Sequence, residues 1–136
     1  MSELISFSKV LEHERLCDRL NALRGMVGTA RADAPDRLAS ATLTLTAAAL
    51  LRDLYRLISR EPGARTLPRL DPLHPPRHQH LAEMLRDARL ALDAFAHAHR
   101  DHDDETGDEW LTIEALDFMA ERQQKKLSPP AEAGGY

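Results

Sequence analysis

The stretch ATLTLTAAALLRDLYRLISR, residues 41–60, decides the fold class. At the 100° that an α-helix turns per residue, its large apolar side chains fall on one face. That face consists of Leu43, Ala47, Leu50, Leu54, Leu57 and Ile58. The pattern predicts a helix that ends near Arg60, because Pro62 cannot continue it. We expect it to start after ADAPD, where Asp33 can cap it and Pro35 suits a first turn.

Two segments on the C-terminal side carry the same periodicity. One begins within HPPRHQH and runs to about His102, with an apolar face made of Leu81, Met84, Leu85, Ala88, Leu92 and Phe95. The other begins at TGDEW, where Thr106 and Glu109 have the spacing of a capping box, and runs to about Lys126. Its apolar face is made of Leu111, Ala115, Phe118 and Met119, with Leu116 beside it. Leu50, Leu54, Leu92 and Phe118 are predicted to be core residues.

The first helical segment runs from about Ser2 to Val27 and ends near Gly28, which can serve as a C-cap. It carries two apolar stripes that point in roughly opposite directions. One stripe is Leu16, Leu20, Leu23 and Val27, and the other is Leu4, Phe7 and Leu11. Either the helix breaks near His13, or its first half packs against a second apolar partner.

Composition supports an all-α fold, because Leu and Ala supply most of the apolar residues and aromatic residues make up only 4%. We predict a four-helix bundle over residues 1–127, followed by a disordered tail at 128–136. Residues 61–78 contain five prolines and are too long for a tight turn. They predict a proline-rich crossover between the second and third helices, whose leucines, Leu67, Leu70 and Leu73, pack on the bundle.

Charge and cysteine content narrow the class of protein. The chain has 136 residues, a net charge of −4 and a single cysteine, Cys17, which cannot form an intramolecular disulfide. The N-terminus does not resemble a signal peptide, and no apolar run reaches the roughly 18 residues that a membrane span requires. These features predict a cytoplasmic protein without a membrane segment. The acidic balance argues against general nucleic-acid binding.

The stretch FAHAHRDHDDE, residues 95–105, has two interpretations. If it were helical, His99 and Asp103 would be four residues apart on one face, and a metal site would use His99, His102 and Asp103 first. The chain offers no obvious set of remaining ligands. The interpretation we favour is a boundary between two helices, because cationic side chains suit a helix C-terminus and acids suit the next N-terminus. We therefore predict no metal and no cofactor.

Catalytic motifs are not evident. His13 and Cys17 are four residues apart in the first helical segment, a spacing that would allow a base and a nucleophile to meet. The sequence shows no orienting acid and no Gly-rich phosphate loop, so we interpret Cys17 as a structural residue and predict that the chain is not an enzyme.

Arginines recur every four residues in the second helical segment, at Arg52, Arg56 and Arg60. Arg65, Arg69 and Arg77 follow in the predicted crossover. Arginine side chains match phosphate oxygens, so this region could contact an anion or a nucleic-acid backbone. The alternative is that the stripe pairs with acids of the chain itself.

The favoured function is that of a small cytoplasmic α-helical protein-interaction module, such as an adaptor, regulator, chaperone-like or inhibitor subunit. Leu4, Phe7 and Leu11 are the expected partner-binding face, with a homodimer as the specific hypothesis. A metal- or small-ligand-binding bundle that uses the His/Asp cluster is one alternative. A nucleic-acid-associated helical subunit that uses the arginine stripe is the other.

Overall fold

The computed structural model describes residues 5–103, 107–110, 112 and 113. The chain divides into two compact units. One unit consists of residues 11–98, and the other combines the N-terminal ten residues with the chain from His99 onward. The described chain is predominantly α-helical and contains three α-helices. Among the described helices, none has both the length and the apolar composition that crossing a bilayer requires.

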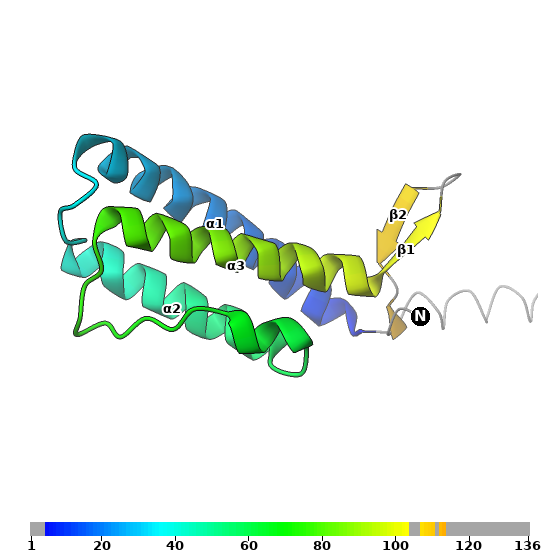
Figure 1. Ribbon diagram of the computed structural model, residues 1–136. Coiled ribbons are helices and arrows are strands. Elements are labelled where there is room, and N and C mark those ends of the chain that lie inside the picture. Colours follow the sequence, from blue (N-terminus) through cyan, green and yellow to red (C-terminus); the bar gives the residue numbers. More distant parts are fainter. Residues whose placement is uncertain (1–4, 104–106, 111, 114–136) are drawn as a thin grey trace, which may run out of the picture. The chain divides into compact units, whose positions relative to one another are not determined.

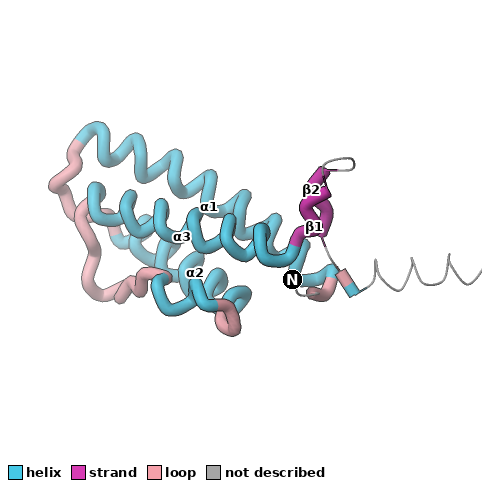
Figure 2. The backbone as a smooth tube through the Cα atoms, turned by 45° about the vertical axis from the view of Figure 1, so that its right-hand side comes forward, coloured by secondary structure: helices cyan, strands magenta, loops and turns pink. Residues whose placement is uncertain are grey.

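Three helices lie side by side in the unit of residues 11–98 (Figures 1 and 2). They are α1 (Phe7–Asp33), α2 (Ala41–Ile58) and α3 (His78–His99). Helix α1 runs antiparallel to α2, and α3 runs parallel to α2 because the chain between them returns along the bundle (Figure 1). This return begins with a short 3-10 helix, η1 (Pro62–Thr66).

The predicted apolar faces form the core of this unit. Leu50, Leu54 and Leu92 are buried, as predicted. The α3 face from Leu81 to Phe95 is buried throughout. The stripe of α1 that contributes to the core is Leu16, Leu20, Leu23 and Val27. The crossover buries Leu67 but leaves Leu73 83% exposed, so the prediction that its leucines pack on the bundle is wrong for Leu73.

Helix α1 is longer than predicted. It continues without a break through His13 and ends at Asp33, so Gly28 is not its C-cap. Glycine inside a helix costs about 1 kcal/mol relative to alanine, a cost that burial of Val27 beside it can offset. The helix ends just before Pro35, because proline disfavours helical backbone in the residue that precedes it.

The start of α2 also differs from the prediction. Ser40, not Asp33, is the N-cap, and its hydroxyl accepts a hydrogen bond from the backbone amide of Leu43 at 3.1 Å. Residues 34–40 instead form a connection that pairs with the end of the crossover. The Ala39 amide donates to the Pro76 carbonyl at 2.7 Å, and the His78 amide donates to the Arg37 carbonyl at 2.9 Å.

The second unit contains a β-hairpin where the sequence predicted helix. Strand β1 (Arg100–Asp103) pairs antiparallel with β2 (Gly107–Trp110). The predicted start of a fourth helix at TGDEW is therefore wrong, since residues 107–110 are extended, and a bundle of four helices is not confirmed. The remainder of that predicted helix, with Phe118, lies outside the described residues, as does the tail at 128–136.

The first residue of β1 and the last residue of β2 are in contact through their side chains. Arg100 is opposite Trp110 in the register, and its guanidinium carbon lies 4.5 Å from the centroid of the indole ring. A cation over the face of tryptophan is a favourable contact. In the same unit, the Ile113 amide donates to the Ile5 carbonyl at 3.0 Å.

Candidate anion-binding cleft

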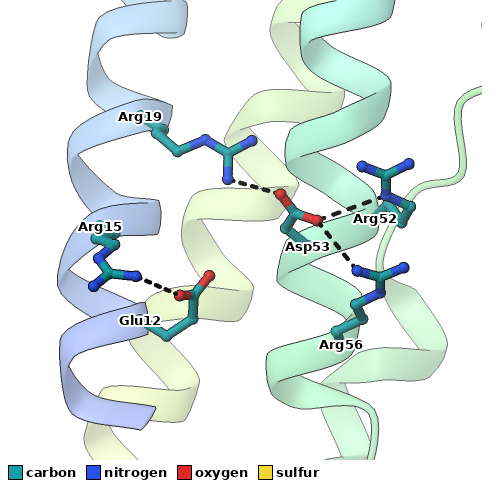
Figure 3. Close-up of polar contacts among 6 residues, drawn as sticks. All are labelled: Glu12, Arg15, Arg19, Arg52, Asp53 and Arg56. Carbon is teal, nitrogen blue, oxygen red and sulfur yellow. Dashed lines mark hydrogen bonds and ion pairs between the residues drawn. The ribbon is translucent and has the colours of Figure 1, made fainter. Parts of the chain in front are cut away.

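Asp53 is the centre of a charged cluster on α2 (Figure 3). Arg19 of α1 donates from Nη1 to its Oδ2 at 2.8 Å. Two arginines of α2 approach its other oxygen, Arg52 at 3.6 Å and Arg56 at 3.9 Å. The Asp53 side chain is 25% exposed, so this pairing is screened less than it would be at a fully open surface. We call Asp53 with Arg19, Arg52 and Arg56 the Asp53 cluster.

The surroundings of Asp53 favour its charged form. The hydrogen bond from Arg19 lowers the pKa of the Asp53 carboxyl, and the positive charges of Arg19, Arg52 and Arg56 lower it further. Partial burial acts in the opposite direction and is outweighed. Asp53 is therefore ionised at neutral pH, and it compensates part of the positive charge on α2.

Beyond the C-terminus of α2 the surface is hollowed into a cleft of about 710 Å³. Its walls come from the last turn of α2, from η1 and from the start of the crossover. The polar side chains in its lining are Arg60, Arg65, Arg69, Tyr55, Ser59 and Thr66, together with one acid, Glu61. We call this site the arginine cleft. Its volume lies within the range of roughly 300–1,000 Å³ that is typical of ligand sites.

Positive charge in the arginine cleft is left largely uncompensated. Within the part of the chain that the structure describes, no ion pair joins Arg60, Arg65 or Arg69 to an acid. Glu61 supplies one negative charge, and the C-terminus of α2 adds a partial charge of only about −0.5. Three guanidinium groups therefore exceed the opposing charge, and their planar forks suit carboxylate or phosphate oxygens.

A second hollow adjoins the arginine cleft. It has a volume of about 310 Å³ and an apolar lining of Ala48, Leu51, Leu67, Pro68 and Leu70. Tyr55 and Arg69 line both hollows, and Arg52 also borders the second. The Arg69 guanidinium carbon lies 5.9 Å from the centroid of the Tyr55 ring, so these two shared residues lie close to each other. We call the second space the apolar hollow.

The predicted arginine stripe is divided between these environments. Arg52 and Arg56 lie beside Asp53, as the alternative of pairing with the chain's own acids predicted. Arg60 lines the arginine cleft with Arg65 and Arg69 of the crossover. The sequence analysis placed Arg65 and Arg69 in the predicted crossover, shortly after the arginine stripe of the second helical segment. The cleft itself was missed, because the turn at η1 that folds the crossover against α2 has no periodic pattern.

The His13 and Cys17 side chains meet, but their setting does not activate the thiol. Cys17 Sγ lies 3.7 Å from His13 Nδ1, and His13 Nε2 lies 3.1 Å from the Leu92 carbonyl oxygen. The buried His13 ring stacks on Phe95 with the two centroids 5.7 Å apart. Burial raises the pKa of the Cys17 thiol, which favours its neutral and unreactive form. The pair joins α1 to α3 as part of the core.

The His-rich stretch does not keep the helical spacing that the metal alternative required. Helix α3 ends at His99, which is buried, while His102 and Asp103 belong to β1. The side chains of residues 101–109 lie outside the described part. Among the side chains that the structure describes, no group of three or more potential metal ligands comes together. A helix ends within this stretch, as predicted, but the prediction that another helix follows at TGDEW is wrong, because residues 107–110 form a strand.

The predicted partner-binding residues differ in how far they are described. Phe7 is 52% exposed and Leu11 is 44% exposed, so both are available to solvent although they are large and apolar. Leu4 lies outside the described residues. The homodimer that these residues suggested stays a prediction.

Comparison with known proteins does not assign the chain to a family. No family model matches the chain, and no curated protein or solved structure matches it significantly.

Proposed function

We propose that this chain is a small helical protein-interaction module that acts by binding and holds an anionic side chain of its partner in the arginine cleft. The observation that supports this most directly is the set of Arg60, Arg65 and Arg69 around one concave site without an ion pair to any described acid. The hydroxyl groups of Ser59 and Thr66 line the same site but donate to the backbone carbonyls of Arg56 and Gly63, so the arginines supply the donors for an anion.

The arrangement favours a protein partner over a nucleic-acid backbone. A polyanion needs cations spread along its length, but Arg52 and Arg56 are already engaged by Asp53. The net charge of −4 on the whole chain would also repel a polyanion beyond the cleft. A single carboxylate or phosphorylated side chain needs only the concave site.

Binding of short peptides to the full chain tests the proposal. A fluorescently labelled oligoglutamate should bind the wild-type protein, whereas the corresponding oligoglutamine should not. Arg65→Glu should abolish binding, since it reverses one charge in the cleft. Arg24→Glu is the matched control, because Arg24 is an exposed arginine of α1 outside the cleft, and it should bind nearly as well as wild type. Equal losses in the two variants would show that only the overall charge matters and would contradict the proposal.

A further inference from the structure

The arginine cleft and the apolar hollow are adjacent and share lining residues, so one ligand could occupy both spaces. Tyr55 and Arg69 line both, and Tyr55 is 41% exposed. An anion in the cleft can therefore lie near Arg69, which also borders the apolar hollow. A group attached to that anion can then enter the adjoining apolar hollow.

The apolar hollow is suited to one large apolar side chain. Its apolar lining comes from Ala48 and Leu51 of α2 and from Leu67, Pro68 and Leu70 of the crossover, and Arg52, Tyr55 and Arg69 complete it. Its volume of about 310 Å³ is at the lower end of the usual range for ligand sites, which does not suit a long acyl chain. Burial of an apolar side chain there would add affinity in proportion to the area removed from water.

We infer that the partner segment is an acidic peptide with a large apolar side chain close to its carboxylates, the carboxylates in the arginine cleft and the apolar side chain in the apolar hollow. This inference rests on the proposed function and adds the sequence character of the partner. An extended peptide advances about 3.3 Å per residue, so neighbouring residues can occupy adjoining spaces. Charge complementarity selects the acidic end, and the five arginines and two acids between Arg52 and Arg69 bias the whole surface toward an acidic segment.

A series of labelled peptides tests the inference by fluorescence anisotropy with the full chain. Each peptide carries a run of glutamates and one leucine, which is moved stepwise away from the run, and each has a partner peptide with alanine in place of leucine. The best leucine peptide should bind about tenfold more tightly than its alanine partner. Ala48→Gln fills the apolar hollow with a polar side chain and should remove this tenfold difference between the leucine peptide and its alanine partner.

Circular dichroism should show that Ala48→Gln keeps its helicity, because glutamine is a good helix former. Leu70→Ser alters the hollow from the crossover side, and it should give the same result independently of α2. Arg65→Glu should weaken the leucine and alanine peptides alike.

Each contrary outcome has its own meaning. If leucine and alanine peptides bind equally at every spacing while Arg65→Glu weakens both, the apolar half of the inference is wrong and the anion site remains. If Arg65→Glu weakens neither, the proposed function fails as well. If a single-stranded oligonucleotide, inorganic phosphate or dodecyl phosphate displaces the best peptide more effectively than unlabelled peptide does, the acidic-peptide inference is overturned.

Discussion

Arginines spaced four residues apart, at Arg52, Arg56 and Arg60, have two different environments in this protein. Arg52 and Arg56 lie close to Asp53, which Arg19 also binds from α1 (Figure 3). Arg60, four residues after Arg56 and just beyond the C-terminus of α2, lines a cleft with Arg65 and Arg69, and Glu61 is the single acid among the described residues of the lining. The sequence spacing of four residues is the same. What differs is whether a neighbouring element contributes an acid or more arginines.

This difference teaches how a surface stripe should be interpreted. A run of arginines at four-residue spacing suggests a continuous basic surface, but Asp53 places a negative charge beside two of these arginines. The remaining arginine, Arg60, forms a cationic site only together with residues from a separate segment of the chain. For this chain the segment is the proline-rich crossover, which brings two further arginines to the end of α2.

Both environments depend on α2 as a fixed platform, so the largest effect should come from its core. Leu54 is fully buried, and its neighbours in the sequence are Asp53 of the Asp53 cluster and Tyr55 of the arginine cleft. Leu54→Ala should lower the free energy of unfolding by about 2–5 kcal/mol, because it removes apolar contacts and leaves a cavity. Urea unfolding followed by circular dichroism measures this. A loss below about 1 kcal/mol would show that α2 is not held by this core.

The Asp53 cluster should contribute modestly to stability. Asp53→Asn keeps the size of the side chain but removes the charge that holds Arg19, Arg52 and Arg56. We expect a loss of up to about 1 kcal/mol in the free energy of unfolding, because partly exposed ion pairs are screened. Unfolding in urea at low and high salt provides the measurement. If the variant is as stable as wild type at low salt, the cluster is not a structural contact.

The same residue predicts a pH dependence. The pKa of Asp53 is lowered in the folded chain, so its stabilising contribution is fully present above the unfolded value of about 3.9. It should be lost as the pH falls through the lower folded pKa. The difference in stability between wild type and Asp53→Asn should therefore be constant at pH values near neutral and shrink below about pH 4. A difference that grows on acidification would contradict the assigned direction.

The arginine cleft should contribute least to stability. Arg65 is exposed and has no ion pair to a described acid, so Arg65→Glu should change the free energy of unfolding by no more than about 0.5 kcal/mol. Strong destabilisation by this substitution would indicate instead that the cleft is part of the fold.

Much of the helical core could be predicted because it depends on local periodicity. The 3.6-residue periodicity predicts that Leu50, Leu54 and Leu92 are buried. This pattern can be seen in the sequence without knowing which element each helix packs against. Helix ends were predicted less well. Asp33 has good capping chemistry, yet Ser40 caps α2, because the chain between them forms backbone hydrogen bonds to the end of the crossover. Such contacts join residues distant in sequence and leave no local pattern.

The hairpin and the cleft show the same limit. Thr106 and Glu109 have capping-box spacing, but residues 107–110 pair with β1 and Trp110 meets Arg100. For the arginine cleft, the sequence showed only that Arg60, Arg65 and Arg69 are close to one another along the chain. It could not indicate which of them an acid would engage, because Arg19 and Asp53 are brought together only by packing of α1 on α2.

The most direct test is to observe the arginine side chains individually by NMR during titration with oligoglutamate, which has no apolar side chain to occupy the hollow that Arg52 borders. The Nε–Hε resonances of Arg60, Arg65 and Arg69 should shift together and saturate, because their guanidinium groups line the site. Those of Arg52 and Arg56 should move little in wild type, since Asp53 engages them. They should respond only in Asp53→Asn. Equal shifts of all five arginines in the wild-type protein would contradict the division on which the proposed function rests.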